Sequence, residues 1–170
     1  MDDKDHISES GALGLASRIR RLLERLLRDG KRVYQMAGME FEVRWFAVFH
    51  LLTRRSPLSI TEIADALGQR HPTVIQMVEE MIQRGLVRSA RDVADGRRRQ
   101  IGLTAEGRKV ARRLQPIWHA FDEAGRELLS EGGNNFLASL EKVESAIGRR
   151  SMLERIHAKL HDGTGAESHD

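Results

Sequence analysis

The sequence contains no cysteine, only 3 prolines and only 5% aromatic residues in 170 positions. Without thiols, a disulfide framework, a thiolate metal site, a cysteine nucleophile and a thiol redox sensor are excluded. No apolar run approaches the ~18 residues of a membrane span, and no apolar stretch follows the acidic N-terminus as in a signal peptide. The composition, 40% apolar and 31% charged, therefore predicts one soluble, mainly helical domain in the cytoplasm.

Motifs of the common enzyme classes are also missing. We find no phosphate-binding glycine loop, nucleophile elbow or His-Glu-x-x-His zinc motif, and we predict neither an enzyme nor a cofactor. His157 and His161 share one helix face, but two ligands are too few for a metal site, which favours a solvated face.

Positive charge is concentrated in one window. The net charge is +3, yet residues 84–113 contain ten basic and three acidic residues and carry +7. Such a block indicates an anionic partner. A solvated charged face is the alternative for this feature taken alone.

Residues 59–85 have the pattern of two short helices joined by a tight turn. Ser59 and Glu62 have capping-box spacing, and Gly68 stands where a helix end favours a left-handed backbone. Pro72 suits the first turn of the second helix, which Gly85 ends. Apolar stripes follow the helical period at Ile60, Ile63, Ala64 and Leu67, and again at Val74, Met77, Val78, Met81 and Ile82. These features together predict a helix-turn-helix.

A β-hairpin is predicted directly after this motif. Residues 86–89 and 100–103 have strand patterns, and Asp95-Gly96 is a hairpin-turn dipeptide between them. Thr104 then caps a long helix with Glu106 in its first turn. A helix-turn-helix followed by a basic hairpin predicts a winged helix, so the expected fold is mainly α with a small β-hairpin wing.

The flanking segments are predicted to be helical and amphipathic. We expect a disordered N-terminus over 1–10, a winged helix-turn-helix lobe over 38–104, dimerisation helices over 11–37 and 105–161, and a disordered tail over 162–170. Gly30 interrupts the first helix pattern, but Val33 and Tyr34 return in phase, so the helix can continue through it. Asn135 is a candidate cap after the glycines at 132 and 133. The flanking helices carry more apolar surface than a small winged-helix core can cover, which predicts a two-fold homodimer. A large monomeric core is the alternative.

The order of these elements resembles the MarR family of transcriptional regulators over residues 13–160. The wing carries the most specific part of the resemblance, at Asp92, Asp95, Arg97, Ile101, Leu103, Thr104 and Gly107. One position departs from the pattern, because Ala94 stands where the family often has an arginine that enters the minor groove. The resemblance implies that Arg97 braces the wing through an aspartate, for which Asp95 is the candidate.

The predicted second helix is a candidate for the DNA major groove. With Val74, Val78 and Met81 facing the core, its N-terminal end leaves four polar side chains to contact DNA: Arg70, His71, Thr73 and Gln76. Arginine pairs with guanine, glutamine with adenine, and threonine with a thymine methyl group or a phosphate. Exposed Ile75 could also contact a thymine methyl group. Arg98 and Arg99 are the candidate phosphate or minor-groove contacts of the wing.

A small aromatic or phenolic effector is the remaining partner that the resemblance implies. Several aromatic and polar side chains could line its pocket: Tyr34, Phe41, Arg44, Trp45, Phe49, His50, Trp118 and His119. Aromatic residues at helical spacing are more often ordinary core. In the pocket interpretation, Arg44 or His50 would bind a carboxylate or phenolate.

The sequence thus predicts a homodimeric transcriptional regulator that binds a pseudo-palindromic DNA operator. A repressor is the expected type of regulator. A winged helix that binds protein is the alternative, and Ala94 favours it. The +7 window favours DNA, and the salt dependence of binding separates the two.

Overall fold

The computed structural model describes residues 5–91, 99–133 and 135–164. They fall into two compact units, residues 1–117 and 118–170. The first unit contains α1 (His6–Glu9), η1 (Gly11–Gly14), α2 (Leu15–Met36), η2 (Val43–Trp45), α3 (Phe46–Arg54), β1 (Leu58–Ser59), α4 (Ile60–Leu67), α5 (His71–Gln83), β2 (Val87–Arg91) and β3 (Arg99–Leu103). Helix α6 (Ala105–Gly132) begins in the first unit and continues into the second, which holds α7 (Phe136–Arg149) and α8 (Met152–Thr164).

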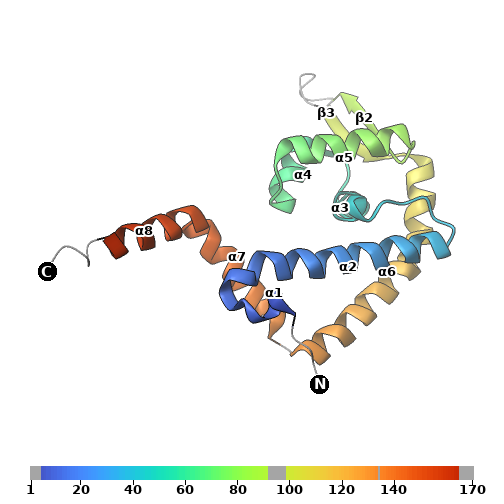
Figure 1. Ribbon diagram of the computed structural model, residues 1–170. Helices are drawn as coiled ribbons and strands as arrows, with labels where there is room; N and C mark the ends of the chain where they lie inside the picture. The colour runs from blue at the N-terminus through green and yellow to red at the C-terminus, as the bar shows by residue number, and fades with distance from the viewer. Residues whose placement is uncertain (1–4, 92–98, 134, 165–170) are drawn as a thin grey trace, which may run out of the picture. The chain divides into compact units, whose positions relative to one another are not determined.

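The first unit contains the predicted winged helix. Helices α4 and α5 form the helix-turn-helix, and the β2–β3 hairpin follows α5 (Figure 1). The strands are antiparallel in the order β1-β3-β2. Strand β1, which the sequence analysis missed, pairs Leu58 with Ile101 of β3. With only two residues, it is too short to leave a period-2 pattern in the sequence.

The core of this unit lies between the helices and one face of the sheet. The predicted stripe of α5 is buried at Val74, Val78 and Met81, each at most 2% exposed. Val87 and Ile101 are buried on the facing strands. Because side chains alternate along a strand, the neighbouring strand residues point to the opposite face of the sheet.

Local capping sets the ends of the helix-turn-helix. Ser59 and Glu62 form the predicted capping box at the start of α4, and Gly68 ends that helix with φ +59°. Thr104 caps α6 by accepting a hydrogen bond from the Gly107 amide at 2.9 Å. Gly107 lies so close to the preceding chain that an added Cβ would be 2.0 Å from the Leu86 carbonyl oxygen.

Three expectations differ from the structure. Residues 6–9, expected to be disordered, form α1 because the Asp5 carboxylate accepts a hydrogen bond from the Ser8 amide and pairs with Arg21. Helix α8 extends to Thr164, so it includes residues 162–164 of the tail that was expected to be disordered. Helix α2, by contrast, continues through the buried Gly30 as expected. Asn135 precedes α7 as expected, but its side chain makes no capping hydrogen bond.

The second unit is made of helices with exposed apolar side chains. Ser151 and Glu154 form a second capping box at the start of α8. The Ser151 hydroxyl and amide donate to the Glu154 carboxylate and hold its pKa below the ordinary value. Within the described part of the chain, no helix is both long and apolar enough to cross a membrane.

Candidate nucleic-acid interface

The N-terminal half of α5 presents the polar side chains that were predicted to contact DNA. Arg70, His71, Thr73 and Gln76 are all exposed, while Val74 between them is fully buried. Pro72 lies in the first turn, and the Arg70 side chain makes no capping bond. The structure therefore brings the four candidates together on the outer side of one helix end.

Two of these residues have neighbours that restrain them. The His71 imidazole Nε2 lies 3.3 Å from the Thr61 hydroxyl, which links α5 to α4. The Gln76 side-chain amide donates to Glu80 Oε1, one helical turn away, at 3.2 Å. Gln76 is thus held by a neighbour before any partner binds.

The Glu80 carboxylate contacts three side chains, an arrangement that was not predicted from the sequence. Its Oε2 accepts a hydrogen bond from Trp45 Nε1 at 2.8 Å and lies 2.9 Å from the Arg44 guanidinium. The same carboxylate also accepts from the Gln76 amide, so it connects η2 to α5. The i,i+4 spacing of Gln76 and Glu80 was available in the sequence, whereas the contact with Trp45 is visible only in the fold.

The described part of the wing is basic. Arg99 is exposed on β3 and pairs in register with Arg91 of β2. Ala94, Asp95, Arg97 and Arg98 lie outside the described residues. The predicted brace between Asp95 and Arg97 and the predicted role of Arg98 therefore stay predictions.

Part of the positive window is neutralised within the chain. Arg84 pairs with Glu40 at 2.7 Å, and Lys109 with Glu106 at 3.4 Å. Arg88 and Arg91 have no ion pair with the residues that the structure describes. Within the described part of the chain, strand β2 thus carries two positive charges of this window without an acidic partner.

The residues proposed for an effector pocket divide into two groups. Tyr34, Phe41, Trp45 and Phe49 are at most 5% exposed, and Phe41 makes edge contacts with the other three rings at 5.1–5.7 Å. These aromatic residues form the core.

The polar candidates lie outside this core. The Arg44 side chain is half-exposed, and His50 stacks on Phe46. In the second unit, Trp118 is buried, and exposed His119 lies 3.5 Å from Glu123.

A small cavity of about 290 Å³ lies at the edge of the aromatic core. Phe41 and Trp45 line it together with Lys31, Gln35, Met39, Glu40, Glu42 and Arg84. Two of the predicted pocket residues, Phe41 and Trp45, thus line this cavity. Among the described residues, no group of three histidine or acidic side chains is arranged to hold a metal ion.

Comparison with known proteins identifies the family. The MarR family model matches residues 38–98. The transcriptional regulator HosA of Escherichia coli O111:H- is 35% identical over 103 residues, which cover 59% of this chain and 76% of the relative. The chain belongs to the MarR family. HosA of E. coli O127:H6 is 36% identical over 78 residues, and this match spans 58% of that relative and 46% of this chain.

Solved MarR-type structures have the same fold. The repressor CouR, bound to a 23-mer DNA duplex, matches with a TM-score of 0.63 and 25% identity over 79% of this chain and 96% of its own. The regulator PcaV of Streptomyces coelicolor, in complex with its natural ligand, matches with a TM-score of 0.62 and 22% identity over 84% and 95%. MarR-family transcriptional regulators are non-enzymatic DNA-binding proteins, so family membership confirms the predicted winged-helix fold and the prediction that the chain is no enzyme.

Proposed function

We propose that this MarR-family chain is a homodimeric, sequence-specific DNA-binding repressor that occupies a pseudo-palindromic operator. The observation that supports this most directly is the two-sided construction of α5. One side is anchored in the core by Val74, Val78 and Met81, and the other presents a cluster of exposed polar side chains at the N-terminal end. A helix of 13 residues is ~20 Å long, which suits the major groove.

In this proposal the exposed residues have different roles. Arg70 pairs with guanine, Gln76 pairs with adenine, and Thr73 contacts a thymine methyl group or a phosphate. His71 contacts the neighbouring backbone or a base edge. From the wing, Arg98 and Arg99 contact phosphates or the minor groove, while Asp95 and Arg97 brace the hairpin.

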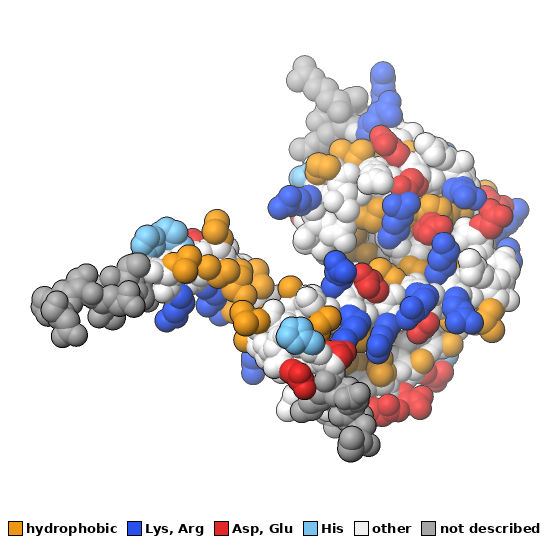
Figure 2. Space-filling view, in the orientation of Figure 1, with side chains coloured by type: hydrophobic (Ala, Val, Ile, Leu, Met, Phe, Trp, Pro, Cys, Tyr) orange, Lys and Arg blue, Asp and Glu red, His pale blue; other side chains and the backbone are white. Residues whose placement is uncertain are grey.

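Exposed apolar helix faces support the homodimer. Helix α2 exposes a stripe in which every side chain is 41–50% exposed: Ile19, Leu22, Leu23, Leu26 and Leu27. The second unit exposes Leu137, Ile147, Leu153 and Leu160 by more than half. Figure 2 shows hydrophobic side chains in a row along α7 and α8 and positive side chains gathered over α2. A second copy would cover the apolar stripes, since patches of this extent mark interaction surfaces.

A small aromatic or phenolic effector is the proposed release signal. The cavity beside Trp45 and the contacts of Arg44 and Trp45 with Glu80 of α5 support a site there. An anionic ligand that engages Arg44 would compete with the Glu80 carboxylate and so disturb the recognition helix.

Fluorescence anisotropy tests the DNA-binding proposal. The full chain is titrated into duplex DNA from upstream of its own gene at 50 to 300 mM salt, with and without nonspecific competitor. We expect binding that survives competitor and weakens steeply with salt, because phosphate contacts release counterions. Gln76→Ala should reduce the preference at one base pair by about 1–3 kcal/mol, whereas Glu79→Ala, on the same helix, should not.

Salt-independent binding, or no binding at 50 mM salt, would contradict the proposal and favour a protein-docking winged helix. Light scattering of the same sample tests the dimer. A mass of one chain at the concentrations used for DNA binding would overturn that part.

A further inference from the structure

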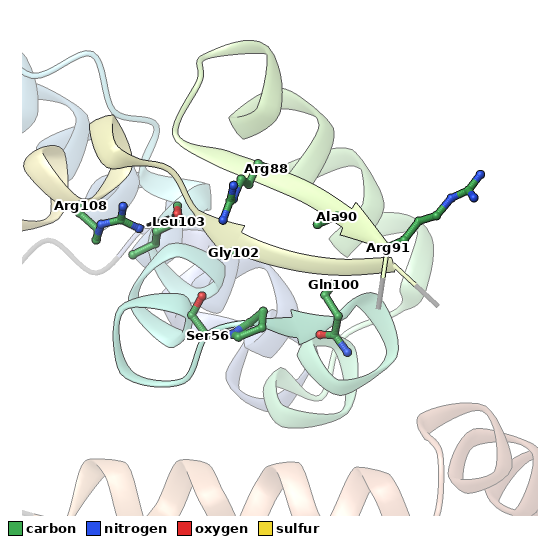
Figure 3. Close-up of a pocket in the computed structure, with 9 residues that line it drawn as sticks. Ser56, Arg88, Ala90, Arg91, Gln100, Gly102, Leu103 and Arg108 are labelled. Carbon is green, nitrogen blue, oxygen red and sulfur yellow. Dashed lines mark hydrogen bonds between the residues drawn. The ribbon is translucent and has the colours of Figure 1, made fainter. Parts of the chain in front are cut away.

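The outer face of the β-sheet forms an open groove that none of the proposed DNA contacts uses. The groove has a volume of about 530 Å³ and lies over β2 and β3, between the segment that leads into β1 and the first turn of α6 (Figure 3). Its lining consists of Ser56, Pro57, Arg88, Ala90, Arg91, Gln100, Gly102, Leu103 and Arg108. We call this feature the sheet-face groove.

The floor of the groove follows from the strand register. Arg88 pairs with Gly102, and Ala90 pairs with Gln100, across β2 and β3. These residues alternate with Val87 and Ile101, which are buried on the core face. Because Gly102 and Ala90 have small side chains or none, the groove is deepest at the middle of its floor. The Ser56 hydroxyl lies 3.3 Å from the position that a Cβ of residue 102 would take, so it stands directly over the floor.

All the charged residues in the described part of the lining are arginines. Figure 3 shows the Arg88 side chain crossing the sheet toward Gly102, while Arg91 projects away from the sheet. Arg108 donates to the Leu103 carbonyl oxygen at 2.9 Å, which fixes its guanidinium at the end of the groove. Arg88 and Arg91 are exposed and have no ion pair with any described residue. Among the described residues, the lining therefore offers cationic donors and contains no carboxylate.

We propose that the sheet-face groove binds a phosphate group. Guanidinium groups present fixed pairs of N–H donors that match phosphate oxygens, and a tetrahedral anion accepts donors from several directions. Here the donors come from β2, from α6 and from the Ser56 hydroxyl. Two sources carry this group: the DNA backbone outside the bases that α5 contacts, and a free phosphorylated small molecule. The first source rests on the proposed DNA-binding function, and the second does not.

Charge-matched variants test the groove. Arg88→Gln removes the donor that crosses the floor, and because Arg88 is exposed the substitution should leave the fold intact. Arg88→Gln/Arg91→Gln removes two positive charges, and Arg112→Gln/Arg113→Gln removes two exposed charges from the same basic window outside the groove. Each protein is titrated into duplexes with short and long flanks over a salt series, and separately with inorganic phosphate while amide shifts of Gly102 are followed by NMR.

If the DNA backbone is the source, Arg88→Gln should weaken binding to the long duplex about tenfold and lower the salt slope by about one. The control Arg112→Gln/Arg113→Gln should still bind the long duplex more tightly than the short one, by the same factor as the parent. If a free ligand is the source, duplex binding stays at the parental level, and phosphate shifts Gly102 saturably in the parent but not in Arg88→Gln.

Two results would overturn the proposal. One is equal loss of affinity in the groove and control variants, with no phosphate shift at Gly102, because net charge alone would then explain the effect. The other is parental behaviour of the groove variants in both titrations. If the parent binds no duplex, the DNA-binding proposal fails, while the phosphate titration still decides whether the groove is a site.

Discussion

Replacing Glu80 with alanine should destabilise the winged helix because three side chains depend on its carboxylate. The largest effect comes from Trp45, which is 3% exposed and would keep a buried indole N–H without its 2.8 Å acceptor. An unsatisfied buried donor costs about 1–3 kcal/mol. The Arg44 side chain is 54% exposed, so losing that ion pair should cost at most about 1 kcal/mol.

Glu79→Ala is the matched control for this change. Glu79 precedes Glu80 on α5, is exposed, and makes no side-chain hydrogen bond or ion pair with the described residues. Both substitutions change helix propensity alike, so their difference isolates the contacts of Glu80. Urea unfolding at one protein concentration, followed by circular dichroism, should show Glu80→Ala less stable than Glu79→Ala by about 1–3 kcal/mol.

A double-mutant cycle assigns this loss to the indole. In a Trp45→Phe background the donor is gone, so Glu80→Ala should cost about 1–3 kcal/mol less than in the parent. Equal unfolding midpoints for Glu80→Ala and Glu79→Ala, or no coupling with Trp45, would refute the reasoning.

Two further predictions concern close packing and pH. Gly107→Ala should lower the free energy of unfolding by about 1–3 kcal/mol in thermal melts, because the added Cβ would overlap the Leu86 carbonyl. In the control Gly125→Ala the added Cβ meets nothing within 4 Å, so this change should stabilise α6 by about 0.5–1 kcal/mol. Equal effects of the two substitutions would contradict the close packing of Gly107. The Glu154 carboxyl has a lowered pKa when folded because Ser151 donates to it, so its contribution to the stability of α8 is present above the unfolded pKa and is lost as pH falls through the folded pKa. NMR titration should show a higher Glu154 pKa in Ser151→Ala, and an unchanged pKa would count against the capping box.

The sequence predicted the elements whose signals are local. The helix-turn-helix could be predicted from Ser59, Gly68 and the apolar stripe of α5, because capping and helical period depend on neighbouring residues. Thr104 predicted the start of α6 for the same reason. Strand β1 was missed because its pairing with β3 is a long-range contact.

The candidate site was predictable only in part. Exposure of Arg70 and Gln76 follows from the period of α5, as predicted. The contacts of Trp45 and Arg44 with Glu80 depend on how η2 packs against α5, and the sheet-face groove depends on the register of Arg88 with Gly102. Neither arrangement leaves a periodic signal along the chain.

Selection of bound sequences from random duplex DNA tests the central claim most directly. The full chain is incubated with the pool at physiological salt, and the retained duplexes are sequenced. We expect an inverted repeat whose half-site centres lie about 10 base pairs apart, as two recognition helices of a two-fold dimer require. A pool without an enriched motif, or a motif with a single asymmetric half-site, would contradict a homodimeric sequence-specific repressor.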